Sequence, residues 1–254
     1  MQDSDTTSTA ADAEPTASRL LRTAAALFRE KGYAGTSTRE LAARLGIQQP
    51  SLYAHMDKKE DLLYAVCVDA LRRVNSAVET ALVAHELPAS PVSPAPAAGD
   101  AARSAGMLVD LAPLAATHDA PDRARAAALD RLRALIAEHL RVTLADPDAF
   151  ATTLIELREL SAARRAEVLA LQDAYAALVR RTIAAAQAAG AVRADIAPRH
   201  LTLSLLNLLN WTVFWYRAEG ELAPAQLAAL LGDVFLRGAE APVESLAATE
   251  PPGR

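Results

Sequence analysis

Apolar residues recur every three or four positions along most of this 254-residue chain, and this spacing predicts a succession of amphipathic helices. The first helix is predicted over residues 16–31, and Gly32 ends it. Two short helices are expected within residues 36–59, and a longer helix begins at Lys58 or Lys59. Strictly alternating stretches, which would indicate strands, are rare. The pattern therefore predicts an all-α fold.

The stretch from Thr36 to Lys59 carries the local signals of two helices around a tight turn. Ser37 and Glu40 have the spacing of a capping box, in which each side chain bonds to a free backbone N–H of the first turn. Gly46 can adopt the left-handed conformation that ends the first helix. Pro50 suits the first turn of the second helix. This order predicts a helix-turn-helix that presents its second helix to the DNA major groove.

The second half of the chain resumes the helical spacing at Pro121. One helix is expected to end before Pro147, and a shorter helix to follow it. A long helix then closes at Gly190, and Pro198 and Pro224 open the last two helices. These elements predict a helical body.

The helix expected over residues 198–216 is apolar on almost every side. Its apolar run of about 15 residues, with Ser204, Asn207 and Asn210 inside it, is too short and too polar to cross a membrane. Such a helix must be buried on several sides, so we expect it to pack on the body and on a partner subunit. The last helix would complete a four-helix homodimer interface, and burial in a monomer core is the alternative.

Proline, small residues and polar runs mark the segments without a predicted helix. Residues 87–106 hold four prolines among small residues, which predicts a flexible surface insertion, with a functional lid as the alternative. The predicted boundaries are a disordered tail over 1–15, a head over 16–62, a body over 63–240, and a second disordered tail over 241–254.

Composition narrows the class and the compartment. The chain is 52% hydrophobic and has only 10 glycines, which suits a sizeable helical core. Its single cysteine, Cys67, excludes a disulfide framework and is expected in a reducing compartment. Residues 1–15 are polar and acidic and do not resemble a signal peptide. We therefore expect a cytoplasmic protein.

The net charge of −5 is unevenly distributed along the chain. Between residues 16 and 66, eight cationic residues stand against five acidic ones, so the head is basic while the rest of the chain is acidic. Because the electrostatic potential near the binding surface, and not the net charge of the whole chain, governs the attraction of DNA phosphates, this distribution is compatible with DNA binding.

The residue pattern offers little support for an enzyme. The sequence has no HExxH, no glycine-rich phosphate loop, no nucleophile elbow and no Cys/His cluster with metal-ligand spacing. We therefore expect no catalytic residue, no metal and no cofactor. An α-helical enzyme remains as the alternative class.

Residues 27–63, LFREKGYAGTSTRELAARLGIQQPSLYAHMDKKEDLL, resemble in order and spacing the DNA-binding region of the TetR family of bacterial regulators. Within them, the run GIQQPSLYAHM is similar to the recognition helix of the tetracycline-repressor branch. The C-terminal run LLNLLNWTVFWYRAEGELAPAQLAALLGDVFLRG, and ELREL at residues 156–160, are similar to the subgroup that controls fatty-acid or sterol-side-chain catabolism.

This resemblance implies an all-α homodimer with an N-terminal three-helix helix-turn-helix head and a C-terminal helical domain for ligand binding and dimerisation. It implies a repressor that a hydrophobic small molecule releases from a near-palindromic double-stranded operator. An acyl-CoA thioester is the effector that the second resemblance favours, and a drug or another lipophile is the alternative. No membrane partner is expected.

The head must anchor phosphates and contact base edges. Hydroxyl groups at the start of the first short helix can bind a phosphate. Residues 48–51 can contact base edges, because glutamine can pair with adenine and proline can touch a thymine methyl group. Tyr53 and His55 are expected beside the groove, and Lys59 matches the family's phosphate-binding lysine. The alternatives are a packing role for Tyr53, a solvated His55 and a turn role for Gln48. The candidate DNA contacts are Ser37, Thr38, Gln48, Gln49, Pro50, Ser51, Tyr53, His55 and Lys59.

Candidate effector contacts come from the body. Arg158 can meet a phosphate or a thioester carbonyl, or form an intramolecular ion pair. Asn207 and Trp211 place polar groups inside an apolar helix, where a ligand or the facing helix of a dimer would bind them. Tyr175 contacts the ligand or is a core residue with a satisfied hydroxyl. His139 is isolated from other potential metal ligands in the sequence.

Overall fold

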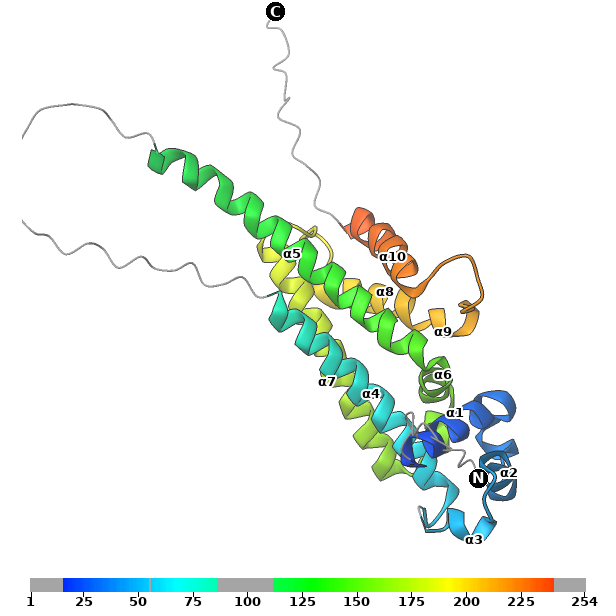
Figure 1. The fold of residues 1–254 in the computed structure, drawn as a ribbon. Coiled ribbons are helices and arrows are strands. Elements are labelled where there is room, and N and C mark those ends of the chain that lie inside the picture. Colours follow the sequence, from blue (N-terminus) through cyan, green and yellow to red (C-terminus); the bar gives the residue numbers. More distant parts are fainter. Residues whose placement is uncertain (1–15, 55, 86–111, 240–254) are drawn as a thin grey trace, which may run out of the picture. The chain divides into compact units, whose positions relative to one another are not determined.

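The computed structural model describes residues 16–54, 56–85 and 112–239, and every element in these ranges is a helix (Figure 1). The predicted all-α fold is confirmed. The elements in chain order are α1 (Thr16–Gly35), α2 (Thr38–Leu45), α3 (Gln49–Leu52), α4 (Lys59–Ala84), α5 (Ala112–Ala145), α6 (Pro147–Ile155), the 3-10 helix η1 (Glu156–Glu159), α7 (Ala162–Ala188), α8 (Pro198–Asn210), α9 (Thr212–Trp215) and α10 (Pro224–Ala239).

Two compact units divide the chain. The first unit contains the residues up to 73 together with 143–173, and the second contains 74–142 together with the residues from 174 onward. Helices α4, α5 and α7 therefore contribute residues to both units. The boundary between residues 62 and 63 stays a prediction, as do the tails 1–15 and 241–254 and the insertion 87–106, which lie outside the described residues.

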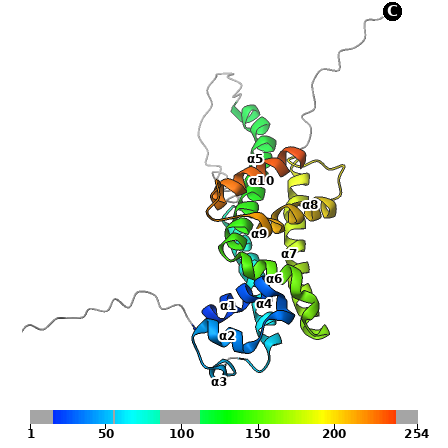
Figure 2. The ribbon, with the colours of Figure 1, turned by 90° about the vertical axis from the view of Figure 1, so that its right-hand side faces the viewer.

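The core of the first unit is formed where α1 packs against α2 and α6 (Figure 2). Phe28, Leu41, Leu52 and Leu63 are fully buried there. Burying side chains of this size contributes about 1.5–3 kcal/mol each. The burial of Leu52 attaches the short α3 to this core, so that the opposite side of α3 faces solvent.

Glycines end or bend the helices at the predicted positions. Gly46 adopts φ 69° and ψ 26°, and its N–H donates to the carbonyls of Ala42 and Ala43, as the predicted cap requires. Gly32 has φ 75° and ψ 160°, a conformation that favours glycine, and it kinks α1 three residues before the helix ends at Gly35. The helical spacing that resumed at Pro121 belongs to a longer helix, because α5 begins at Ala112 and holds Pro121 inside it.

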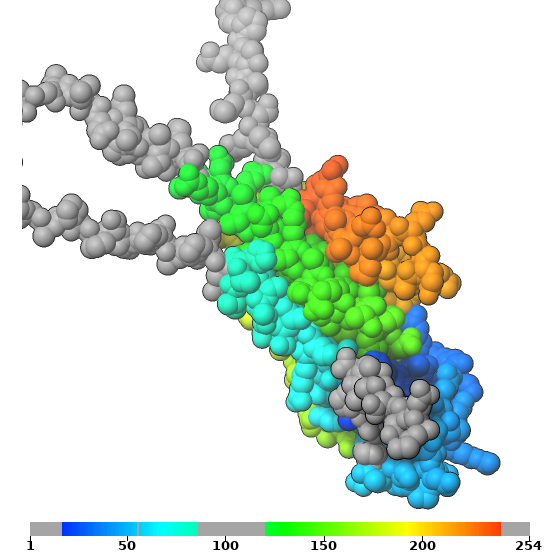
Figure 3. Space-filling view, in the orientation of Figure 1, coloured from blue at the N-terminus to red at the C-terminus, as the bar shows by residue number. Residues whose placement is uncertain are grey.

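The second unit has its own apolar core, with Ile136, Leu140, Ile183, Leu205 and Leu209 fully buried. Helix α10 (orange) lies alongside α5 (green) in Figure 3. A Cβ atom at Gly232 of α10 would lie 3.8 Å from Ile136 of α5, so a glycine permits this close approach.

The helix predicted over residues 198–216 is divided in two. Helix α8 ends at Asn210, Trp211 caps it, and α9 follows as a single turn. Leu203, Trp211 and Trp215 are 60%, 63% and 54% exposed, so the segment is buried on one side in this chain. No helix in the described ranges combines the length and apolar character needed to cross a membrane.

Candidate functional site

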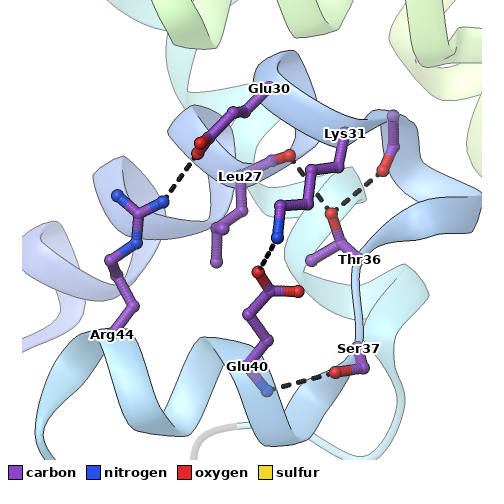
Figure 4. A network of polar contacts seen from close by, with 8 residues as sticks. Leu27, Glu30, Lys31, Thr36, Ser37, Glu40 and Arg44 are labelled. Carbon is purple, nitrogen blue, oxygen red and sulfur yellow. Dashed lines mark hydrogen bonds and ion pairs between the residues drawn. The ribbon is translucent and has the colours of Figure 1, made fainter.

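Half of the predicted capping box is present at the start of α2. The Ser37 hydroxyl accepts a hydrogen bond from the backbone N–H of Glu40 at 3.1 Å. The Glu40 carboxylate bonds instead to the ammonium of Lys31 in α1, and Figure 4 shows the two side chains pointing toward each other. The reciprocal bond predicted for Glu40 is wrong, because a cation is a stronger partner than a neutral backbone N–H.

Further polar contacts fix α2 against α1 (Figure 4). Arg44 of α2 pairs with Glu30 of α1, with 2.6 Å between Nη2 and Oε2. The buried Thr36 hydroxyl lies 2.9 Å from the carbonyl oxygen of Gly32 and 3.2 Å from that of Leu27. These contacts hold the connection between α1 and α2 in one conformation, and so they orient the start of α2.

Helix α3 presents a compact polar surface. Gln48 is extended and precedes the single helical turn, and Pro50 lies in the first turn, as predicted. Gln48, Gln49, Pro50 and Ser51 are all exposed, whereas Leu52 is buried. Four of the predicted DNA contacts therefore lie together on the side of α3 that faces away from the core.

Three predicted DNA contacts meet at one hydroxyl group. The Gln49 amide nitrogen Nε2 donates to Oγ1 of Thr38 at 3.1 Å, and the Tyr53 hydroxyl lies 3.4 Å from the same oxygen. Tyr53 is 48% exposed, so it is largely available at the surface. His55 lies outside the described residues.

Lys59 has internal partners for its ammonium group. Its Nζ donates to the backbone carbonyls of Tyr33 at 2.7 Å and Thr36 at 2.8 Å, and it lies 4.2 Å from the centre of the Tyr33 ring. Lys59 thus ties the start of α4 to the connection between α1 and α2. A phosphate contact by Lys59 stays a prediction.

Arg39 is a site candidate absent from the sequence-based set. It is exposed in the first turn of α2, beside Thr38, and its side chain makes no ion pair or hydrogen bond among the described residues. Its position close to the predicted N-cap residue Ser37 is the sequence feature that could have identified Arg39 as a candidate. Other cations of the head are engaged with carbonyls or carboxylates, namely Arg19, Lys31, Arg44 and Lys59.

Tyr175 and His139 form a buried polar pair in the second unit. The His139 Nδ1 atom lies 2.7 Å from the Tyr175 hydroxyl, and the two rings are stacked with centres 5.7 Å apart. Burial raises the pKa of Tyr175 and lowers the pKa of His139 to about 4. The sequence did not indicate Tyr175 as the partner of His139, because only the packing of α5 on α7 brings together residues 36 positions apart. Within the described part of the chain, no group of three or more His, Cys, Asp or Glu residues could hold a metal.

The other predicted effector contacts lie at the surface. The Arg158 side chain is 79% exposed in η1, and its Nε lies 3.7 Å from Oε1 of Glu159. Arg158 therefore forms an intramolecular ion pair, which was the alternative to a ligand contact. Asn207 and Trp211 are exposed in the single chain, and Trp211 makes an edge contact with Phe214, so their contact with a ligand or with the facing helix of a dimer stays a prediction. Arg158 belongs to the first unit and the other candidates to the second, so the structure does not gather them into one described site.

Two family models match the chain, and both describe the same kind of protein. Residues 20–66 match the bacterial regulatory proteins of the tetR family, and residues 125–239 match the tetracyclin repressor-like C-terminal domain. The chain belongs to the TetR family. The two matched regions contain α2 and α3 in the first case and α6 to α10 in the second.

Individual relatives agree with this membership. The class C tetracycline repressor of Escherichia coli is 45% identical over 56 residues, which are 22% of this chain and 25% of that repressor, so the match spans about a quarter of the relative's length. The TetR family regulator PfmR of Thermus thermophilus is 26% identical with a TM-score of 0.64, over 86% of this chain and 97% of PfmR. AibR, solved with isovaleryl coenzyme A and operator DNA, has a TM-score of 0.61 at 21% identity, over 90% of this chain and all of AibR, which shows a shared fold.

Proposed function

We propose that the protein is a DNA-binding transcriptional regulator that inserts α3 into the major groove of an operator. The observation that carries the proposal is the exposed surface of Gln48, Gln49, Pro50 and Ser51, mounted on the buried Leu52. Residues at the start of a recognition helix are the ones that contact base edges in helix-turn-helix proteins. A glutamine there can pair with adenine through two hydrogen bonds.

Phosphate contacts are assigned to the start of α2. Thr38 and the N-terminal N–H groups of α2 supply hydrogen-bond donors, and the helix dipole favours an anion at that end. The Ser37 hydroxyl keeps its capping bond to Glu40 and can donate its own hydrogen to a phosphate. Arg39 adds an exposed charge one residue further on. These contacts would set the position of α3 in the groove without selecting sequence themselves.

Selection from a pool of random duplexes tests this function directly. We expect the protein to enrich a near-palindromic sequence and Gln49→Ala to weaken binding to it by about 1–3 kcal/mol, because one paired base contact is lost. Binding of the same variant to random duplexes should change much less. Gln172→Ala, a glutamine of α7, is the matched control. The absence of any enriched sequence would refute the proposal.

We further propose that the protein acts as a homodimer through α8, α9 and α10. Leu203, Trp211 and Trp215 recur at multiples of four residues along α8 and α9, and Leu230 and Val234 have the same spacing on α10. All five are between 49% and 63% exposed in one chain. Rows with a spacing of four residues are the ridges that interlock when helices pack, so two copies of this surface can cover each other.

The proposed signal is a hydrophobic small molecule that releases the operator, with an acyl-CoA thioester as the preferred class. The support is the similarity of the C-terminal run and of ELREL at residues 156–160 to regulators of lipid catabolism. AibR, which shares the fold, was solved with an acyl-CoA and operator DNA. A drug or another lipophile is the second candidate, because an apolar helical body suits both.

Thermal denaturation separates the two effector classes. A ligand that binds only the native state raises the free energy of unfolding, by about 2.7 kcal/mol when its concentration is 100 times its Kd. This added stability raises Tm. We expect a rise with short- and medium-chain acyl-CoAs and none with coenzyme A alone. A rise with uncharged hydrophobic drugs but with no thioester would remove the preferred class.

The family and PfmR are regulators, which points away from the alternative of an α-helical enzyme. Hydrolysis of a bound thioester by the purified protein would revive that alternative. A regulator of this type acts on the chromosome, so we assign it to the cytoplasm.

A further inference from the structure

The loop that follows the recognition helix is held by Asp61, a residue in the first turn of α4. Its Oδ2 atom accepts hydrogen bonds from the backbone N–H groups of Asp57 at 2.9 Å and Lys58 at 2.7 Å. These two residues lie in the connection between α3 and α4. The Asp61 carboxylate therefore fixes the two residues through which the connection enters α4.

The second oxygen of the same carboxylate is bound by α7. Arg164 places its Nη2 atom 2.6 Å from Oδ1 of Asp61, although the two residues are 103 positions apart. The Arg164 and Asp61 side chains are 28% and 23% exposed, so this pair is more shielded from solvent than a surface ion pair. Burial alone would raise the pKa of Asp61, but the N–H of Lys58 and the Arg164 guanidinium lower it below its usual value.

Neighbouring contacts join the same two helix starts. Glu60 accepts a hydrogen bond at 2.9 Å from the backbone N–H of Ser161, the residue before α7, and its other oxygen lies 3.7 Å from Arg164. One turn further along α4, the Tyr64 hydroxyl donates to Glu167 of α7. The start of α7 is thus bound to the start of α4 over two turns.

We propose that Arg164 is a positioning residue for DNA recognition, which orients the recognition helix through Asp61 and the loop at residues 57–58. Arg164 lies far from the candidate DNA contacts in sequence, and it acts on them through one carboxylate shared between α7 and the loop. Helix α7 continues from this contact to residues 174–188 of the second unit. Helix α4, which carries Asp61, also continues into the second unit, so the shared carboxylate joins two of the helices that could carry a change from that unit to the DNA contacts. The inference rests on the proposed DNA-binding function.

Arg164→Met tests this role, with Arg165→Met as the matched control. Both variants remove one positive charge from the same turn of α7, but the Arg165 side chain makes no ion pair or hydrogen bond within the described residues. We expect Arg164→Met to weaken binding to the selected duplex by roughly 2- to 30-fold, the range seen for residues that couple sites without touching the ligand. The slope of log K against log salt should stay unchanged, since no phosphate contact is lost. Arg165→Met should bind as the wild type does.

Hydrogen exchange supplies a measurement that needs no DNA. In Arg164→Met the amides of Asp57 and Lys58 should exchange faster, because the carboxylate that accepts their hydrogen bonds has lost its anchor. The amide of Glu40, held by Ser37, should keep its rate. If Arg164→Met does not fold, Asp61→Asn is the second variant, since it keeps an oxygen for the loop and removes the charge that Arg164 binds.

The outcomes are separable. Equal behaviour of the Arg164→Met and Arg165→Met proteins in both measurements would overturn the proposal, and so would faster exchange spread evenly over the chain. If the wild type selects no duplex, the proposed function fails, and the exchange rates at residues 57 and 58 still decide whether Arg164 holds the loop.

Discussion

Lowering the pH from 7.5 to 5 should cost the folded protein about 2 kcal/mol of stability through His139 alone. The imidazole is fully buried beside Tyr175, and burial lowers its pKa from 6.5 to about 4. The unfolded chain gains a proton as the pH falls through 6.5, whereas the folded protein gains it only near pH 4. This contribution to stability is complete above pH 6.5 and is lost progressively between pH 6.5 and pH 4. The total loss is about 3 kcal/mol.

Urea denaturation at several pH values between 7.5 and 5 measures this effect. His139→Gln should flatten the pH dependence, because the residue that titrates is gone. Tyr175→Phe is the matched control: it should keep the slope while lowering stability at every pH by about 1–3 kcal/mol, the cost of an unsatisfied buried group. Glu60 does not interfere, since hydrogen bonds from Lys58 and Ser161 lower its pKa to about 2 and its contribution is lost only below pH 4.5. Equal slopes for wild type and His139→Gln would contradict the assignment.

Placing a charge on the exposed row of α10 should dissociate the proposed dimer and, with it, operator binding. In a two-fold interface each substitution occurs twice, so Val234→Glu introduces two carboxylates into the apolar surface. Like charges and unpaired charges of this kind cost several kcal/mol, which raises the dimer Kd by at least about 100-fold. A near-palindromic operator needs two linked heads, so the affinity for it should fall at least as steeply.

Val83→Glu is the matched control for this prediction. Val83 is 65% exposed on α4 and Val234 is 57% exposed on α10, so the two variants add the same charge at similarly exposed valines. Sedimentation velocity at micromolar protein should show monomers only for Val234→Glu, with helicity unchanged in both variants. A Val234→Glu protein that still sediments as a dimer would place the interface elsewhere.

Local interactions could be predicted from the sequence because their partners lie within one helical turn. The Ser37 cap, the Gly46 turn and Pro50 in the first turn of α3 all follow from residue type and spacing. The sequence also predicted that residues 48–51 are available for base contacts, and all four are exposed.

Contacts between distant residues could not be predicted, because periodicity indicates which face of a helix is buried but not which side chain it meets. Glu40 had two available partners, and only the packing of α1 on α2 selected Lys31 over the backbone of Ser37. Lys59 carries the sequence signal of a phosphate contact, yet the fold brings the carbonyls of Tyr33 and Thr36 to its ammonium.

The sequence by itself determined an all-α chain, the helix-turn-helix and the residues exposed on its second helix, since these depend on backbone preferences over a few residues. Only the tertiary structure decided the pairing of His139 with Tyr175 and of Asp61 with Arg164. Polar side chains can find many partners in water, and a single partner is selected only when packing removes water and brings specific helices together.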